Sequence, residues 1–283
     1  MRLGFNLIQY TDLQGIEVFA QNIISHIKLE ENDSLILFVN QKSAELFRDL
    51  NPRAMLKIKR FGCLSSLNLI LYQQFGFIRN LKREKIDVLF CPSLAGPLLF
   101  KNKIVTIHDL AFKRFKKEAS LFHRIYLWLG ALSAKYYSLK IITISDFSRQ
   151  EISQLLKIDS SQILNISEGP PGLPEIKDGD DRKVLAKFNL LENDKIKKYF
   201  FYVGNIRPRK NLQQIIKAFE AFSQTTPDCI FILAGRADTK SANLKKAFSE
   251  RKIKEKIIFC GFVTQSEKAI LLKNSTDFSH FGF

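Results

Sequence analysis

The chain has 283 residues, 46% of them hydrophobic and 25% charged, with four cysteines and a net charge of +16. The apolar content excludes a disordered chain, and the widely spaced cysteines argue against a disulfide framework or a zinc site and favour a reducing cytoplasm. No apolar run reaches the roughly 20 residues that span a bilayer. The nearest, 61–78, is interrupted by Asn68, Gln73 and Gln74.

Short apolar runs alternate with helical patterns along the chain. Residues 16–27 and 212–222 place apolar side chains at helical spacing, and Asn211 stands where an N-cap belongs. Continuous apolar runs are typical of strands buried on both faces, so the alternation predicts parallel sheets covered by helices. The expected strands are Leu3–Ile8, Leu35–Val39, Asp87–Cys91, Ile104–Ile107, Ile141–Ile144, Phe200–Val203, Ile230–Ala234 and Ile257–Cys260.

A segment rich in proline and glycine marks a domain boundary. It reads GPPGLP from Gly169 and DGDD from Asp178, and both stretches break strand and helix. We therefore expect one Rossmann-like domain at 1–168, a linker at 169–181 and a second Rossmann-like domain at 182–283. Ligands of such α/β folds bind beyond the carboxyl ends of the strands, which predicts a site in a cleft between the domains.

The first candidate site is the turn between the strand that ends at Val203 and the helix that begins near Asn211. It contains Gly204 and the cations Arg207, Arg209 and Lys210. A helix N-terminus carries a partial positive charge and unpaired N–H groups, so cations there are unfavourable unless an anion offsets them. The turn therefore predicts a diphosphate site, with a basic loop that binds no ligand as the alternative.

Two further candidates also follow or precede predicted elements directly. His108 and Asp109 come immediately after an apolar strand, where a catalytic pair of an α/β enzyme belongs; a structural capping pair is the alternative. Gly15 precedes the first predicted helix and would let a ligand approach the backbone closely, although one glycine is far from a full dinucleotide-binding fingerprint.

Five short segments follow one another along the chain: TIHDL at 106–110, ITISDFSR at 142–149, YVG at 202–204, PRKNL at 208–212 and AF at 218–219. Together these segments resemble glycosyltransferase family 4. The resemblance implies two Rossmann-like domains in the GT-B arrangement. It also implies a retaining, metal-independent transfer of a mannose-like hexose from a UDP- or GDP-sugar to a saccharide or lipid-linked acceptor in lipopolysaccharide or other cell-surface polysaccharide synthesis.

The resemblance also implies roles for single residues. Gly15 would approach the donor phosphate and acceptor, and His108, paired with Asp109, would lie near the transferred sugar. Gly204, Arg209 and Lys210 would hold the diphosphate and stabilise the departing nucleotide, on which negative charge builds. The loop near the nucleotide base would be Gly261, Phe262 and Val263. The resemblance implies a site in which two cations neutralise the diphosphate without a bound metal, so no metal is expected.

The sequence departs from the family at its end. A glutamate pair that contacts the sugar and ribose would follow Thr276–Phe278, but the chain stops at Phe283. We therefore expect a truncated second domain whose sheet has three recognisable strands and an unpaired hydrophobic edge. Loss of the sugar contacts predicts little or no transferase activity, so a fragment that binds nucleotide weakly is the alternative function.

The net charge leaves other partners open. Lys113, Arg114, Lys116 and Lys117 precede a run rich in large apolar residues, which suits an anionic membrane surface on the inner face of the cytoplasmic membrane. The alternative is that Leu121, Ile125, Trp128 and Leu129 face the domain core. A nucleic-acid-binding function has only the charge in its favour, because no recognition motif is present in the sequence.

Overall fold

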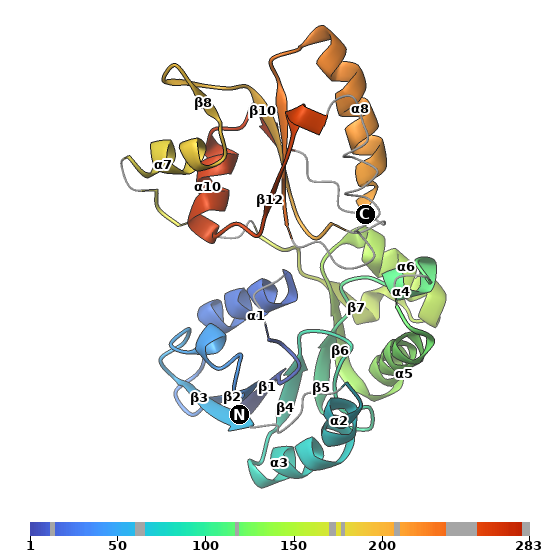
Figure 1. Ribbon diagram of the computed structural model, residues 1–283. Coiled ribbons are helices and arrows are strands. Elements are labelled where there is room, and N and C mark those ends of the chain that lie inside the picture. The colour runs from blue at the N-terminus through green and yellow to red at the C-terminus, as the bar shows by residue number, and fades with distance from the viewer. Residues whose placement is uncertain are drawn as a thin grey trace. The chain divides into compact units, whose positions relative to one another are not determined.

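The computed structural model describes residues 1–11, 15–59, 66–116, 119–169, 174–176, 179–206, 210–235 and 254–278. The chain forms two compact units, Met1–Pro170 (unit 1) and Pro171–Phe283 (unit 2), as Figure 1 shows. No helix in the described part of the chain is long and apolar enough to cross a membrane.

Unit 1 is built on a parallel sheet of seven strands in the order β3-β2-β1-β4-β5-β6-β7. The first six follow the order of nucleotide-binding folds, in which ligands bind beside the point where the order reverses. In unit 1 this switch point lies between β1 and β4. The strands are β1 (Arg2–Leu7), β2 (Ser34–Asn40), β3 (Ala54–Lys59), β4 (Val88–Cys91), β5 (Lys103–Thr106), β6 (Ser138–Thr143) and β7 (Ile163–Asn165).

Helices cover both faces of this sheet because its strands are apolar on both sides. Along β2, Leu35, Leu37 and Val39 pack in the cluster with α1, whereas Ile36 and Phe38 pack in the cluster with α3, α5 and α6. The helices are α1 (Gly15–His26), α2 (Ser66–Leu71), α3 (Phe77–Arg83), α4 (Ala111–Arg114), α5 (Leu121–Tyr137) and α6 (Asp146–Leu156), with 3-10 turns η1 (Glu45–Phe47) and η3 (Ser160–Gln162) and a π-helical turn η2 (Tyr72–Gly76).

Unit 2 is also built on a parallel sheet, with the strand order β12-β11-β10-β13. Its switch point lies between β10 and β13, and α8 covers one face while α7 and α10 cover the other. The elements are α7 (Asp180–Lys187), the hairpin β8 (Leu191–Glu192) and β9 (Lys195–Ile196), β10 (Tyr199–Val203), α8 (Leu212–Thr225), β11 (Ile230–Ala234), the 3-10 turn η6 (Lys254–Lys256), β12 (Ile257–Gly261), α10 (Gln265–Lys273) and β13 (Asp277–Phe278).

Every strand expected from an apolar run is present, and the helices expected at 16–27 and 212–222 are confirmed as α1 and α8. The expectation of three strands in the second sheet was wrong. β13 pairs with β10 through Phe200–Asp277 and Phe201–Phe278 and forms a fourth strand. The strands β3 and β7 were not expected, because β3 is an edge strand with exposed Met55 and Ile58 and β7 has only three residues.

Candidate functional site

The first candidate region lies at the carboxyl edge of the unit 1 sheet, at its switch point. The connection after β1 is fixed by Asn40, whose amide donates to the carbonyl oxygens of Ile8 at 2.8 Å and Tyr10 at 2.6 Å. The Tyr10 hydroxyl donates to Ser93 Oγ at 2.9 Å and so joins the β1 connection to the β4 connection across the switch point. Burial raises the pKa of Tyr10, so this hydroxyl keeps its proton.

His108 stands at the same edge, directly after β5. Its Nε2 lies 2.8 Å from the carbonyl oxygen of Pro92, and because a carbonyl only accepts, Nε2 carries a hydrogen. The other ring nitrogen, Nδ1, lies 3.6 Å from Glu168 Oε1. The ring edge-packs on Phe19 of α1, with centroids 4.9 Å apart and planes at 80°. His108 is thus held from three sides and presents Nδ1 toward a carboxylate.

Asp109 does not pair with His108 among the described contacts. Its carboxylate accepts the backbone N–H of Ala111 at 2.9 Å, which closes the turn that leads into α4. This contact matches the structural capping role that the sequence left open as the alternative to catalysis. The side chain that faces His108 instead is Glu168, which the sequence did not single out.

Gly15 is the first residue of α1 and is exposed. A Cβ built on Gly15 would meet no atom of the described residues within 4 Å. The described part of the fold therefore does not require a glycine at this position. The residues that precede it, 12–14, lie outside the described part of the chain.

The second candidate region is the carboxyl edge of the unit 2 sheet, where three adjacent strands end in Gly204, Gly235 and Gly261 (the glycine edge). The N–H of Gly204 donates to Ala234 O at 3.0 Å, and the N–H of Gly235 donates to Gly261 O at 2.7 Å. A Cβ on Gly235 would lie 1.8 Å from Gly204 O, so no side chain fits there. The edge is consequently bare backbone across the three strands.

The helix α8 begins beside this edge. Asn211 is its N-cap residue, as expected, but it adopts the left-handed conformation at φ 51° and its side chain makes no capping hydrogen bond. Its carbonyl instead accepts the N–H of Gln214 at 3.0 Å. Lys210 is half-buried next to it. Arg209, with Arg207 and Pro208, lies outside the described residues.

The segment expected near a nucleotide base has side chains in two different environments. Gly261 ends β12 at φ 69°, a conformation that favours glycine. Phe262 is 67% exposed, whereas Val263 is buried in the core of unit 2. Of the two side chains, Phe262 is therefore the one that solvent or a ligand reaches.

Sequence reasoning missed Gly235, Asn40 and Glu168. A signal for Gly235 existed, because it follows the apolar run 230–234 just as Gly204 follows 200–203. Nothing local distinguishes Asn40 or Glu168, since their contacts join distant segments. Within the described residues, no group of three or more His, Cys, Asp or Glu side chains is arranged to hold a metal ion.

Two parallel sheets, each with helices on both faces and a bare or polar carboxyl edge, define the GT-B class of fold. The structure of Anabaena Alr3699/HepE in complex with UDP and glucose is similar at 15% identity and a TM-score of 0.68, covering 99% of this chain and 74% of that one. WaaG, a glycosyltransferase involved in lipopolysaccharide biosynthesis, is similar at 10% identity and a TM-score of 0.65, covering 98% and 74%. At these identities the likeness concerns the fold.

Sequence comparison finds a family model that matches unit 2. Residues 185–280 match the model of the family described as glycosyl transferases group 1. The O-antigen chain mannosyltransferase RfbU of Salmonella typhimurium is 24% identical over 221 residues, which cover 78% of this chain and 57% of that protein. The resemblance to a glycosyltransferase seen in the sequence is confirmed by both matches, and the chain spans 57% of the length of this curated relative.

Proposed function

We propose that the chain is the nucleotide-sugar-binding body of a retaining glycosyltransferase that transfers a mannose-like hexose from a UDP- or GDP-sugar to a saccharide or lipid-linked acceptor in cell-surface polysaccharide synthesis. The observation that carries the proposal is the glycine edge, which lies within the region that matches the family. The mannosyltransferase relative supports the choice of sugar. The similar structure that holds UDP and glucose supports the class of donor.

The glycine edge suits the diphosphate of the donor. Bare backbone lets a phosphate approach the N–H groups at the start of α8, where the helix of 14 residues contributes a partial positive charge. Arg209 and Lys210 would add two charges that neutralise the leaving diphosphate as negative charge builds in the transition state. In this proposal the two cations neutralise the diphosphate, which a metal ion does in other transferases.

The edge of unit 1 suits the sugar and acceptor. Because His108 Nε2 is bonded to Pro92 O, a sugar hydroxyl would contact the ring at Nδ1, beside Glu168 Oε1 at 3.6 Å. Asp109 would act by holding the turn that presents His108, since its carboxylate is bonded to the backbone of Ala111. The open space around Gly15 would admit a ligand at the start of α1.

Calorimetric titration with UDP and GDP tests the phosphate site. We expect Arg209→Ala combined with Lys210→Ala to weaken binding at least about tenfold, because a hydrogen bond to a charged group contributes about 1.5–3 kcal/mol. A matched control, Lys195→Ala with Lys198→Ala, removes the same charge from exposed positions of unit 2 and should bind like the wild type. Equal binding by all three proteins would remove the proposed phosphate site.

Incubation with UDP- and GDP-hexoses and a saccharide acceptor tests transfer. Release of nucleotide together with an NMR-detected product of unchanged anomeric configuration would support a retaining transferase. Inversion at the anomeric carbon would contradict the retaining mechanism. Nucleotide binding without any transfer would support the alternative function, a binding fragment.

We also propose that unit 1 contacts an anionic membrane through α5. Leu121, Phe122, Ile125 and Leu129 recur at helical spacing and are all exposed, between 45% and 67%. Only Trp128 of the expected core-facing set packs against the core, and Lys113 Nζ lies 3.6 Å from the centre of its ring. Exposed apolar side chains beside cations favour the interface of anionic lipids.

Co-sedimentation with vesicles tests this surface. We expect binding to vesicles that contain phosphatidylserine and little binding to phosphatidylcholine alone. Leu121→Ser with Ile125→Ser should lose most of the binding. Leu155→Ser with Leu164→Ser, which are also exposed but lie on α6 and β7, should not. Equal binding of the two double variants would contradict a specific contact through α5.

A further inference from the structure

The connection at residues 92–98 (the 92–98 loop) begins directly after β4 and borders the switch point of unit 1. At its start, Pro92 O accepts the Nε2–H of His108 at 2.8 Å. In its middle, Ser93 Oγ accepts the Tyr10 hydroxyl at 2.9 Å, and Ala95 O accepts the Asn6 amide at 3.2 Å. The loop is therefore the segment that fixes the direction of the His108 ring.

The π-helical turn η2 holds the other end of this loop. Gln74 donates from Nε2 to Gly96 O at 3.1 Å and accepts the N–H of Leu98 at 2.8 Å. The neighbouring Gln73 is fully buried and also points inward, where its Oε1 accepts the Tyr126 hydroxyl at 2.8 Å. A wider π-helical turn directs two consecutive glutamines to the interior, and such turns are frequent at functional sites.

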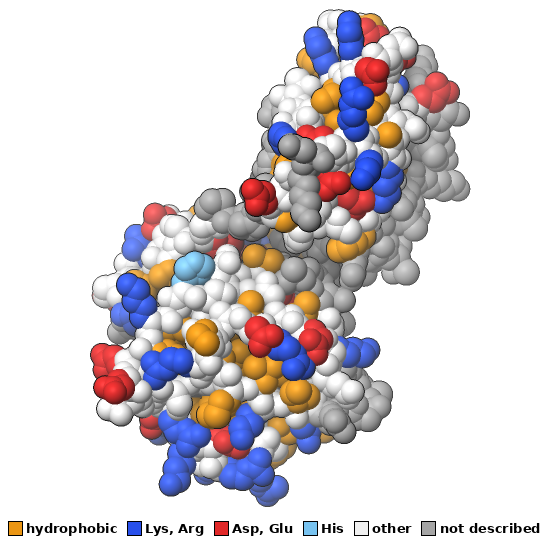
Figure 2. All heavy atoms as spheres, turned by 90° about the vertical axis from the view of Figure 1, so that its left-hand side faces the viewer, with side chains coloured by type: hydrophobic (Ala, Val, Ile, Leu, Met, Phe, Trp, Pro, Cys, Tyr) orange, Lys and Arg blue, Asp and Glu red, His pale blue; other side chains and the backbone are white. Residues whose placement is uncertain are grey.

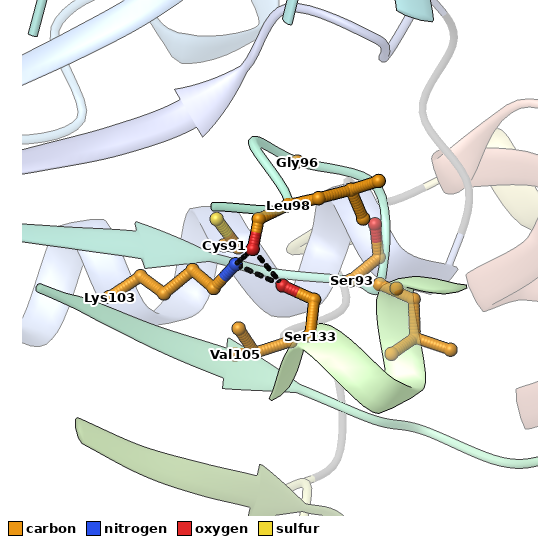
Figure 3. A pocket seen from close by; sticks show the side chains of 9 residues that line it. Cys91, Ser93, Gly96, Leu98, Lys103, Val105 and Ser133 are labelled. Carbon is orange, nitrogen blue, oxygen red and sulfur yellow. Dashed lines mark hydrogen bonds between the residues drawn. The ribbon is translucent and has the colours of Figure 1, made fainter. Parts of the chain in front are cut away.

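Lys103 supplies the remaining support from below the loop. It is 3% exposed, and its ammonium donates to Pro97 O at 2.6 Å, to Leu98 O at 3.0 Å and to Ser133 Oγ of α5 at 2.6 Å. Figure 3 shows this side chain reaching Leu98 and Ser133 beside a cavity of about 10 Å³, room for roughly one water molecule. Each of its three donors thus has an acceptor.

A buried ammonium is costly, so its presence needs a physical reason. Burial lowers the pKa of Lys103 to about 8, and the group still carries its charge at neutral pH. The inward-facing carbonyl oxygens of Pro97 and Leu98 supply the reason, because buried carbonyls without donors are themselves unfavourable. Among the described contacts the ammonium therefore stabilises the conformation of the 92–98 loop by hydrogen bonds to its carbonyl oxygens and not by an ion pair with a carboxylate.

We propose that Lys103 is a positioning residue: by fixing the 92–98 loop it holds Pro92 O where it orients the His108 imidazole. The role given to that imidazole rests on the proposed function, but the orientation itself does not. Lys103 holds one end of the loop and His108 is bonded to the other. Release of the Pro97–Leu98 end therefore loosens the Pro92 end through a loop of seven residues.

The test is the imidazole N–H signal of His108 in the full chain, which contains four histidines and so has a simple nitrogen spectrum. In the wild type, the Nε2–H bonded to Pro92 O should exchange slowly with solvent. Lys103→Met removes the ammonium group and keeps an unbranched side chain that is one atom shorter. We expect it to accelerate this exchange, and that of the loop amides, by about tenfold or more. Lys101→Met, an exposed lysine in the same connection, is the matched control.

The outcomes separate the two proposals. A folded Lys103→Met protein with His108 and loop exchange like the wild type would overturn the positioning role. If that variant does not fold, Ser133→Ala, which removes one partner of the ammonium, should give a smaller acceleration at the same atoms, and no change there would equally overturn it. In the proposed function the diphosphate of UDP or GDP binds at the glycine edge of unit 2, whereas Lys103 and His108 lie in unit 1. Absence of nucleotide binding in the wild type would therefore reject the proposed function and leave the Lys103 result standing.

Discussion

At the scale of single residues, the glycine edge of unit 2 shows how a missing side chain can be required by the fold or only by a ligand. Gly235 is required by the fold, because the backbone of Gly204 occupies the place of its Cβ. Gly15 is not, because the space around it is open. We therefore predict that substitution by alanine affects the stability of the protein differently at the two glycines.

We expect Gly235→Ala to destabilise the protein by at least about 3 kcal/mol, because the clash with Gly204 O cannot relax without moving the backbone. Gly15→Ala should leave stability unchanged or slightly higher, since alanine favours the helix. Thermal denaturation monitored by circular dichroism measures both. A Gly235→Ala protein as stable as the wild type would contradict the close packing of Gly235 against Gly204 O. Reduced transfer by a stable Gly15→Ala protein would support ligand approach at Gly15.

At the scale of elements, two ion pairs join helix α7 to helix α10 on one face of the unit 2 sheet. Lys187 of α7 lies 2.5 Å from Glu267 of α10, and Lys273 of α10 lies 3.1 Å from Asp181 of α7. Glu267 also closes a capping box with Thr264 at the start of α10. The hydrogen bond from Lys187 is the main cause that holds the pKa of Glu267 below its ordinary value of 4.5.

This lowered pKa predicts a stability that depends on pH. The folded state binds the proton of Glu267 less readily than the unfolded state does. The stabilisation is therefore fully present above about pH 5 and is lost as the pH falls through the lowered pKa. Glu267→Gln should lower the urea midpoint of unit 2 at pH 7 but not in strong acid. Glu255→Gln, at an exposed position of the same unit, should match the wild type at both pH values. If Glu267→Gln still has a lower urea midpoint than the wild type in strong acid, the loss of stability comes from altered packing and not from the lost charge.

At the scale of the whole molecule, the two units have separate hydrophobic cores, and the sheet of each unit has its own carboxyl edge. Figure 2 shows Lys and Arg side chains on both units, most crowded at the lower border of unit 1. Because the positive charge is spread in this way, the net charge of +16 identifies no docking site by itself. Site assignments therefore depend on the local geometry of each unit.

We expect UDP or GDP to protect unit 2 in hydrogen exchange and to leave the core strands of unit 1 unchanged. At about one hundred times its dissociation constant, a ligand that binds only the native state adds about 2.7 kcal/mol to the free energy of unfolding. Mass spectrometry of peptides from 199–206 and from 254–264 measures the protection. Protection confined to unit 1 would contradict the assignment of the nucleotide to the glycine edge.

Much of the architecture follows from local patterns in the sequence. Continuous apolar runs predicted β1, β2, β4, β5, β6, β10, β11 and β12. Residues that follow such runs, His108 and Gly204 among them, lie at the carboxyl edges of the sheets. Short or exposed strands such as β3 and β7 escaped prediction because they bury too little apolar surface to leave a pattern. The sequence predicted Asn211 as an N-cap, but it did not predict the left-handed backbone of Asn211 or its lack of a side-chain capping hydrogen bond.

The sequence by itself therefore determined the class of fold and the family to which the chain is similar, since these depend on periodicity and on motifs a few residues long. Only the tertiary structure decided that Gly235 packs on Gly204, that His108 faces Glu168 rather than Asp109, and that Lys103 supports the 92–98 loop. Each of these features is a contact between segments far apart in the chain, such as Lys103 with Ser133, 30 residues away. Strand order brings such segments together, and no local pattern records it.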